Sequence, residues 1–234
     1  MATEGTNERR VAVVTGGSGA IGGAIVARLA PDHIVVTLDR TECDVVVDLG
    51  DSEDVRRAAG VVLERWGRCD VLVHSAAMVA FGPFDEYDLD VWRQVQAVNV
   101  ESALLLTQAF APGMRDRGFG RVIFIVSNTF WNPPGAHMLS YIASKGALIG
   151  MARTLAVGLG GNGIAVTAVA PGLTRTPASV VVPAEEFADT EAHQALQRPL
   201  TPDDTAAVVA MLARDDAAAL TGQTLTVDGG LVLT

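Results

Sequence analysis

Residues 11–23 read Val-Ala-Val-Val-Thr-Gly-Gly-Ser-Gly-Ala-Ile-Gly-Gly, and this stretch decides the fold. The β-branched run 11–14 predicts a short buried strand, and residues 24–29 have a helical pattern that Pro31 ends. Glycines between a strand and a helix let the backbone approach a pyrophosphate, and the helix N-terminus offers free N–H groups to an anion. A glycine-rich turn can also be no more than a tight turn. Its position here favours phosphate binding.

The alternation of strand and helix continues along the chain and predicts an α/β fold. The expected strands are 11–14, 33–39, 43–49, 69–74, 121–127, 164–170 and 223–227, and the expected helices are 24–29, 52–66, 88–111, one through Tyr141 to about 159, and one from 202. Parallel strands joined by helices form a single doubly wound sheet of the Rossmann type, flanked by helices. We therefore expect one dinucleotide-binding domain over residues 1–234.

Composition excludes several classes of protein. The 234 residues are 49% hydrophobic and 19% charged, which is typical of a globular chain. A net charge of -10 without a basic run argues against a nucleic-acid surface. The polar start lacks the apolar core of a signal peptide, and no window holds eighteen uninterrupted apolar residues, so we expect a cytoplasmic protein without a membrane span. Cys43 and Cys69 follow no metal-ligand spacing, and no metal site is expected.

An acidic residue ends the second predicted strand and bears on the cofactor. Asp39 follows the glycine turn by about twenty residues, the distance at which a carboxylate hydrogen-bonds an adenosine ribose. The same carboxylate would repel a 2′-phosphate, so the pattern favours NAD(H) over NADP(H). Arg40 follows directly and could pair with such a phosphate, which leaves the alternative open. Asp39 could also be an ordinary turn residue.

Four polar residues in the second half are candidates for proton chemistry. Tyr141 and Lys145 are four residues apart and share one face of a helix, where an ammonium is expected to lower the pKa of a phenol. Ser127 ends the apolar run 122–126, and Asn99 interrupts an apolar helical stripe. Each has a structural alternative: a packed tyrosine, a solvated lysine, or an asparagine satisfied by a neighbouring helix.

Taken in order, these motifs resemble the short-chain dehydrogenase/reductase family from Thr15 to Gly230. The resemblance identifies Asn99, Ser127, Tyr141 and Lys145 as the catalytic tetrad. It implies a catalytic domain over residues 1–234 with a substrate lid at about 177–200. It assigns cofactor contacts to the glycine turn, the acid of the second strand, the pair 48–49 that contacts adenine, the segment in the place of the family's Asn-Asn-Ala-Gly, the tetrad, and the segment after the sixth strand. These residues are Gly16, Ser18, Gly19, Ile21, Gly22, Asp39, Asp48, Leu49, Ser75, Ala76, Tyr141, Lys145, Pro171, Gly172, Leu173 and Thr174.

The chain departs from the family pattern in three places. Ala20 stands where the family has its middle glycine, with Gly19 one position early. The segment 74–77, His-Ser-Ala-Ala, keeps one of the four usual residues. The fourteen-residue spacing from Ser127 to Tyr141 is long for the family.

The resemblance implies a reversible hydride transfer between a nicotinamide and a carbonyl or secondary-alcohol carbon. Tyr141 would act as general acid or base, and Lys145 would lower its pKa and bind the nicotinamide ribose. Ser127 would hold the substrate oxygen, and Asn99 would fix a water that links Lys145 to solvent. Relatives in this family are usually homotetramers.

Substrate identity is predicted from the loops around these residues. The chain is similar to the bacterial NAD-dependent secondary-alcohol dehydrogenases that act on 1-phenylethanol, and a hydrophobic ketone or alcohol, aryl ketones included, is expected. The expected substrate contacts are Ser127, Tyr141, Thr129, Phe130 and Met138. A 3-oxoacyl carrier-protein reductase is an alternative, but it should prefer NADPH and carry a basic docking patch. A catalytically silent, cofactor-sensing binding protein is another, but it would typically lose the tyrosine or the lysine.

Overall fold

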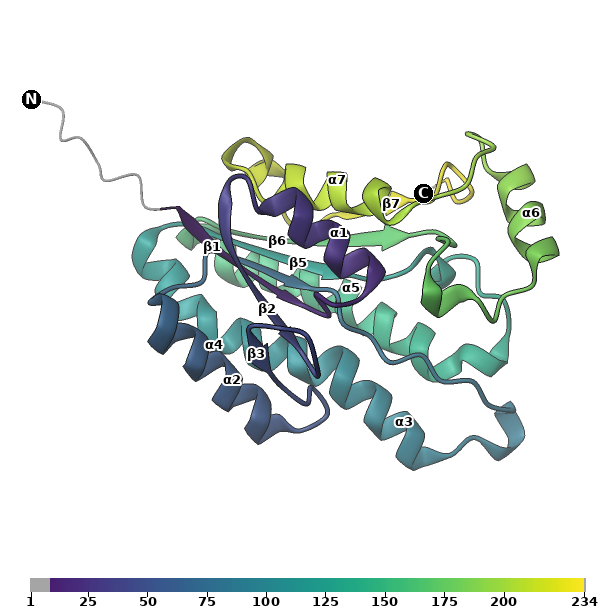
Figure 1. The fold of residues 1–234 in the computed structure, drawn as a ribbon, viewed down its shortest axis with the longest axis horizontal. Helices are drawn as coiled ribbons and strands as arrows, with labels where there is room; N and C mark the ends of the chain where they lie inside the picture. The colour runs from purple at the N-terminus through teal and green to yellow at the C-terminus, as the bar shows by residue number, and fades with distance from the viewer. Residues whose placement is uncertain (1–8, 234) are drawn as a thin grey trace, which may run out of the picture.

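Seven parallel strands form one sheet in the computed structural model, which describes residues 9–233 (Figure 1). The strands are β1 (Arg10–Thr15), β2 (His33–Asp39), β3 (Val45–Val46), β4 (Val71–His74), β5 (Gly120–Ile125), β6 (Ile164–Pro171) and β7 (Thr224–Val227). Their order is β3-β2-β1-β4-β5-β6-β7, and every neighbouring pair is parallel. The order reverses at β1, as in a doubly wound sheet. The predicted fold class is confirmed.

Helices cover both faces of the sheet (Figure 1). On one face lie α1 (Ala20–Leu29) and α7 (Pro202–Leu212), and on the other lie α2 (Ser52–Trp66), α4 (Ser102–Arg117) and α5 (Leu139–Leu159). The run 11–14 of strand β1 is apolar throughout because helices cover both faces of the strand. Val11 and Val13 pack in the cluster with α2, α4 and α5, whereas Ala12 and Val14 pack with α1 and α7. A strand covered on both faces has no polar side.

The helix predicted over residues 88–111 is three elements. Helix α3 (Leu89–Gln96) passes through a π-helical segment, Ala97–Glu101, into α4. The extra residue per turn in the π segment coincides with Asn99, whose buried amide bonds to groups outside the helix. Helix α4 continues past Pro112 and ends at Gly118 in the left-handed conformation, with φ of 65°.

The strand predicted over residues 43–49 is only two residues long, Val45–Val46. Side chains replace the missing ladder bonds. The Asp44 carboxylate accepts hydrogen bonds from the backbone N–H and the hydroxyl of Thr37, both at 2.8 Å. The Asp48 carboxylate accepts the N–H of Gly50 at 2.8 Å and turns the chain toward α2.

The expected lid is an ordered segment between β6 and α7. It contains a short 3-10 turn, Pro177–Ser179, and helix α6 (Ala184–His193). Arg175, which precedes the expected lid, contacts helix α6. Its guanidinium lies 4.5 Å from the centre of the Phe187 ring and 2.7 Å from the Glu191 carboxylate.

Residues 136–162 are long and apolar enough to cross a membrane when judged by length and composition alone. In the fold this segment contains helix α5, which packs against one face of the sheet. Leu148, Ile149 and Ala152 of α5 are buried in the cluster that covers β5 and β6.

A buried carboxylate, that of Asp70, links several segments at the amino-terminal edge of the sheet through hydrogen bonds. Asp70 has no exposed surface, and it accepts hydrogen bonds from Arg68 Nε (2.7 Å), Arg117 Nε (2.9 Å) and the backbone N–H of Val11 (2.9 Å). Burial alone would raise the pKa of Asp70, but the hydrogen bonds and the charges of the two arginines hold that pKa below its usual value. This ionised carboxylate therefore stabilises the fold above its usual pKa, and the contribution is lost as the pH falls through the lower folded-state pKa.

Asp70→Asn should lower the free energy of unfolding by about 3 kcal/mol, because it removes the buried charge that pairs with the guanidinium groups of Arg68 and Arg117. Urea unfolding at pH 7 measures the change. Asp90→Asn is the control, because its pair with Arg93 is exposed on both sides and should contribute nothing measurable. Equal stability of Asp70→Asn and wild type would contradict the assignment.

Candidate active site

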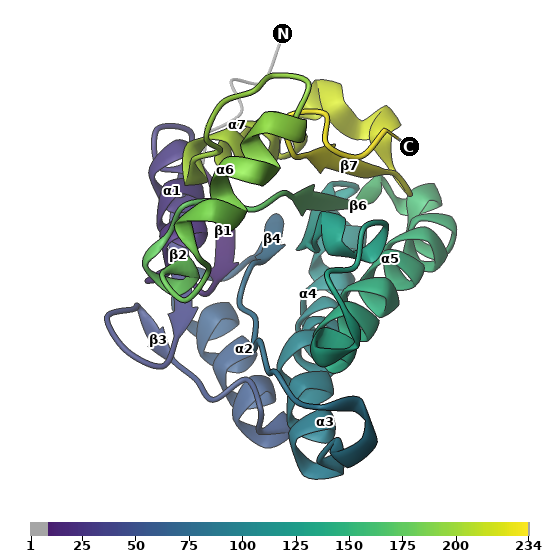
Figure 2. The ribbon, with the colours of Figure 1, turned by 90° about the vertical axis from the view of Figure 1, so that its right-hand side faces the viewer.

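The carboxyl ends of the parallel strands gather the predicted residues at one edge of the sheet (Figure 2). Thr15 ends β1, Asp39 ends β2, His74 ends β4 and Pro171 ends β6, while Ser127 follows β5 by two residues. Figure 2 looks onto this edge, with α6 above it and the loop that leads to α3 below.

The glycine turn is shaped as a phosphate cradle. Gly16 has a φ of 70°, and a Cβ at Gly22 would lie 2.0 Å from the Gly16 carbonyl oxygen, so neither position admits a side chain. Gly19 is the extended N-cap of α1, with no side chain capping it. The first intrahelical bond is donated by Gly23 N to Gly19 O, so the N–H groups of residues 20–22 remain available to an anion. Ala20 in the place of the family glycine is therefore harmless, because the close approach occurs at Gly16 and Gly22.

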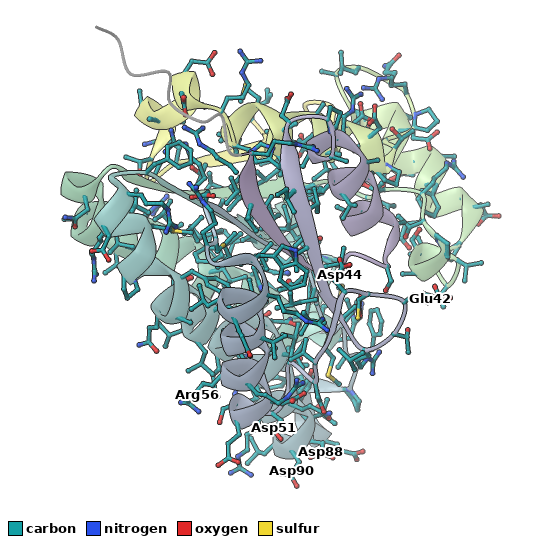
Figure 3. All side chains as sticks on the ribbon, turned by 60° about the vertical axis from the view of Figure 1, so that its left-hand side comes forward. Glu42, Asp44, Asp51, Arg56, Asp88 and Asp90 are labelled. Carbon is teal, nitrogen blue, oxygen red and sulfur yellow. The ribbon has the colours of Figure 1, made fainter. Side chains whose placement is uncertain are left out.

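Asp39 stands directly beside this turn. Its carboxylate accepts hydrogen bonds from the backbone N–H of Ser18 at 3.1 Å and from the Ser18 hydroxyl at 2.5 Å. Arg40 and Glu42 follow it on an exposed loop, where Glu42 takes a φ of 52°. Figure 3 shows Glu42 and Asp44 on this loop. The turn and the acid thus form one polar site at the end of β1 and β2.

The remaining cofactor candidates fall into two groups. Ser75, Ala76, Gly172, Leu173 and Thr174 lie at the carboxyl edge, where the N–H groups of Ser75 and Ala76 bond to the Thr15 hydroxyl at 3.1 Å. Gly172 N donates to Val227 O at 3.0 Å, and the Thr174 hydroxyl donates to the Gly172 carbonyl at 2.9 Å.

Two candidates in the turn before α2 differ from this pattern. Leu49 is buried in the core cluster, so its side chain is not available to an adenine ring, and Asp48 binds its own turn through Gly50. The adenine contact of Asp48 and Leu49 stays a prediction, in which Asp48 would offer its exposed carboxylate and Leu49 its backbone.

Tyr141 and Ser127 are brought together from α5 and β5. The Ser127 hydroxyl interacts with the Tyr141 phenol, and it also accepts hydrogen bonds from the N–H (3.2 Å) and hydroxyl (2.9 Å) of Thr129. Burial raises the pKa of Tyr141, and the bond with Ser127 offsets only part of that rise. The prediction that Lys145 lowers the pKa of Tyr141 is therefore wrong for the protein by itself.

Lys145 shows why the prediction fails. Its side chain is only 1% exposed, its Nζ donates to the Ile125 carbonyl at 2.8 Å, and Nζ lies 5.4 Å from the centre of the Tyr141 ring. Burial lowers the pKa of Lys145 to about 7. An amine that is only half charged near neutrality attracts a phenolate weakly.

The side-chain amide of Asn99 links two segments of the site. Its Oδ1 accepts the N–H of Met78 at 2.7 Å, and its Nδ2 donates to the Met78 carbonyl at 3.0 Å and to the Ser144 hydroxyl at 2.9 Å. These bonds use both amide protons and one of the two lone pairs of Oδ1, and the role of Asn99 in fixing a water stays a prediction. The amide joins the loop after β4 to the helix that carries Lys145.

The predicted substrate contacts do not all face the same space. Thr129 lies beside Ser127, and Met138 immediately precedes α5. The Phe130 ring packs edge-on to Trp131, and a Cβ at Gly146 would lie 2.7 Å from it. Phe130 lines an apolar cavity of about 470 Å³ with Leu139, Ile142 and Ala143. Tyr141 is not among the residues that line this cavity.

Sequence reasoning missed a second polar link behind Ser127. Asn128 donates through Nδ2 to the Asp228 carboxylate at 3.1 Å, and both residues are buried. Asp228 also accepts the N–H groups of Gly230, Leu231 and Val232 at 2.9–3.2 Å. The signal in the sequence is the acid before the glycine pair 229–230, where a left-handed turn presents successive N–H groups to one carboxylate.

The lowered pKa of Lys145 predicts a pH-dependent stability. Between about pH 7 and the unfolded-state pKa of about 10.4, the folded protein binds fewer protons than the unfolded chain, so stability rises with pH. The unfolding free energy of wild type minus that of Lys145→Met should increase by about 2 kcal/mol from pH 7 to pH 9. Parallel curves in urea titrations across this range would show that Lys145 is fully charged in the folded protein.

Comparison with known proteins identifies the family of this chain. A family model described as enoyl-(acyl carrier protein) reductase matches residues 26–232. The chain is 34% identical to dehydrogenase/reductase SDR family member 4 of Sus scrofa, across 95% of this chain and 87% of that protein. It is 31% identical to glucose 1-dehydrogenase of Gluconobacter oxydans, across 94% of this chain and 91% of that protein.

Solved structures give the same result. A structure from Beutenbergia cavernae, assigned as an NAD(P)-dependent gluconate 5-dehydrogenase with NADP bound at low occupancy, superposes with a TM-score of 0.88 and 34% identity, covering 95% of this chain and 96% of that one. A short-chain dehydrogenase/reductase from Serratia marcescens superposes with a TM-score of 0.87 and 31% identity, covering 95% and 97%. The chain belongs to the short-chain dehydrogenase/reductase family of oxidoreductases.

Proposed function

We propose that this oxidoreductase transfers a hydride reversibly between NAD(H) and a hydrophobic ketone or secondary alcohol, aryl ketones included. The family membership establishes a nicotinamide-dependent oxidoreductase acting on CH–OH groups. The observation that carries the finer proposal is the meeting of Tyr141, Ser127 and Lys145 beside the glycine cradle, at an edge flanked by exposed apolar side chains.

The residues present fit a dinucleotide. The Gly16–Gly22 cradle and the free N–H groups of α1 suit its pyrophosphate, and Asp39 suits a ribose hydroxyl. When bound, the nicotinamide supplies or accepts the hydride, and its oxidised ring adds a positive charge to the site.

Tyr141 is prepared for the reductive direction. Because burial raises its pKa, the phenol keeps its proton at neutral pH and can donate it to a carbonyl oxygen that gains charge. Ser127 is placed to hold that oxygen, because its hydroxyl already meets the Tyr141 phenol. In the oxidative direction Tyr141 must lose its proton first, and that needs a positive charge nearby. Lys145 supplies it only in its protonated form.

Charges on the loop after β2 support NAD(H). Asp39, Glu42 and Asp44 oppose the single positive charge of Arg40, so a 2′-phosphate there would meet net repulsion (Figure 3). Asp39 is also held in place by Ser18. The NADP in the Beutenbergia cavernae structure belongs to that protein. Arg40 keeps NADP(H) as the alternative cofactor here.

Side chains around the edge support an uncharged, hydrophobic substrate. Phe81 and Phe84 on the loop after β4, and Val180 and Val181 on the lid, are all exposed. The loop after β4 is joined to the approach to α5, because Gly82 N donates to the carbonyl of His137 at 3.1 Å and the Phe81 ring stacks on the His137 ring at 6.0 Å. These apolar side chains belong to the loop after β4 and to the lid, two segments that follow carboxyl ends of the sheet. They support the 1-phenylethanol type of substrate expected from the sequence.

An acyl carrier-protein reductase is the second candidate, because the matching family model carries that description. The charges near the lid oppose it. Arg175 pairs with Glu191 and Arg198 pairs with Asp204, while Glu185, Glu186 and Asp189 add negative charge. An anionic carrier would find no unpaired basic patch among the lid residues. The third candidate, a silent cofactor-sensing protein, is disfavoured by the presence of all four tetrad residues.

Tyr141→Phe should lower kcat for NADH-dependent reduction of acetophenone by at least about 100-fold, with little change in KM for NADH, because it removes only the transferable proton. Initial rates of NADH oxidation measure both constants. The matched control is Tyr87→Phe, the other tyrosine, whose hydroxyl bonds to the Ser140 hydroxyl at 2.5 Å. Equal activity of Tyr141→Phe and wild type would contradict the role of Tyr141.

Wild type should use NADH at least about tenfold more efficiently than NADPH, which corresponds to about 1.4 kcal/mol of discrimination. Asp39→Asn should narrow the ratio of the two kcat/KM values by raising the NADPH value, since it removes the charge and keeps the shape. Glu42→Gln, on the same loop, is the control and should change the ratio much less. A wild-type preference for NADPH would overturn the assignment of Asp39.

A further inference from the structure

His74 occupies a central and fully enclosed position that the mechanism above does not use. It ends β4 with 0% of its surface exposed, and its register partners are Thr15 on β1 and Phe124 on β5. Paired residues of parallel strands project from the same face of a sheet, so His74 lies on the face covered by α4 and α5. This is the face from which Lys145 reaches the Ile125 carbonyl.

The hydrogen bonds around Thr15 fix the tautomer of His74. A threonine hydroxyl has one proton to donate and two lone pairs to accept with. The Thr15 hydroxyl accepts the N–H groups of Ser75 and Ala76, both at 3.1 Å, and its third partner is His74 Nδ1 at 3.1 Å. Its proton must therefore go to Nδ1. The neutral ring carries its own proton on Nε2.

Nε2 is a buried donor with no hydrogen bond of normal geometry to any residue within 9–233. The ring faces the backbone carbonyl of Asn99, from the π segment, and Lys145, from α5, is the charged group that acts on it. Burial and the Lys145 charge lower the pKa of His74 to about 3, so the ring stays neutral. A buried donor without a well-formed hydrogen bond is costly, and one on the same face of the sheet as Lys145 calls for a role.

We propose that His74 is a positioning residue with two separable tasks, one for each ring nitrogen. Through Nδ1 it holds the Thr15 hydroxyl, and with it the Ser75–Ala76 segment against the glycine turn. The contact is close, since a Cβ at Gly16 would lie 2.8 Å from the Ala76 Cα. Through Nε2–H it faces the Asn99 carbonyl and holds the π segment in place, and so keeps the surroundings of the Lys145 amine fixed for proton exchange at Tyr141.

His74 is not itself a link in proton transfer. Its Nδ1 is occupied by Thr15 and its Nε2 already carries a proton, so no bond to hydrogen is made or broken at the ring. The task at Nε2 rests on the proposed function, because it acts through Lys145 and Tyr141. The task at Nδ1 and the tautomer do not.

Two substitutions separate the tasks. In His74→Asn the shorter amide can still meet Thr15 but cannot reach the Nε2 position. In His74→Gln the longer amide reaches the Nε2 position but loses the Nδ1 acceptor. We expect His74→Asn to keep KM for NADH, lower kcat about tenfold and move the inflection of the kcat–pH profile for alcohol oxidation by about one unit. We expect His74→Gln to keep that profile and raise KM for NADH several-fold.

The same kinetic measurements can contradict the two-task proposal. If His74→Asn has wild-type kcat and pH profile, the Nε2–H donor does nothing and His74 only fills the core. If both variants raise KM and leave the pH profile unchanged, its role is confined to the cofactor turn. Either outcome overturns the two-task proposal.

A spectroscopic measurement tests the tautomer without any assay of activity. Correlation spectra of ¹⁵N-histidine-labelled wild type report the protonation of each ring nitrogen for the four histidines, and the signal lost in His74→Asn identifies His74. We expect a neutral Nε2–H ring that does not titrate between pH 5 and 9. A proton on Nδ1, or titration in this range, would overturn the proposal. Failure of the hydride-transfer function would leave this result unchanged, so the two failures are distinguishable.

Discussion

A single hydrogen bond inside the protein, from Lys145 Nζ to the Ile125 carbonyl at 2.8 Å, sets the position of the chemistry. An amine that is 1% exposed cannot exchange this partner for water, so α5 is held at one height on the carboxyl end of β5. One turn earlier on the helix, Tyr141 then meets Ser127. Burial that lowers the pKa of the amine to about 7 also leaves it able to change its charge near neutrality.

The parallel sheet supplies the rest of the site. Since all seven strands run in one direction, every turn that follows a carboxyl end is available to one ligand. The Thr15 hydroxyl connects two of these turns by accepting the N–H groups of Ser75 and Ala76. Asp228 connects two more, because it binds Asn128 and its own C-terminal turn. Buried polar groups therefore hold these turns together in pairs.

The sequence predicts the parts of this arrangement that depend on local pattern. The glycine turn, the acid at the end of β2 and the helical spacing of Tyr141 and Lys145 are all visible as short motifs, and the parallel fold follows from their alternation with apolar runs. What it does not predict depends on burial in three dimensions. The pKa of Tyr141 rises because neighbouring segments exclude water, and no spacing rule reports that.

Two further differences have the same origin. The π segment at Asn99 exists because Met78 and Ser144, distant in the chain, occupy its amide. Phe130 faces Gly146 and a cavity that Tyr141 does not line, because a glycine on α5 leaves space for its ring. The proposed function requires hydride transfer at this edge of the sheet. Its most direct test is to supply acetophenone and NADH deuterated at nicotinamide C4 on the transferring face, and to locate the label in the product by mass spectrometry. One deuterium on the carbinol carbon of 1-phenylethanol is the predicted result; an alcohol without deuterium, or no alcohol from any hydrophobic ketone in a panel, would contradict the account.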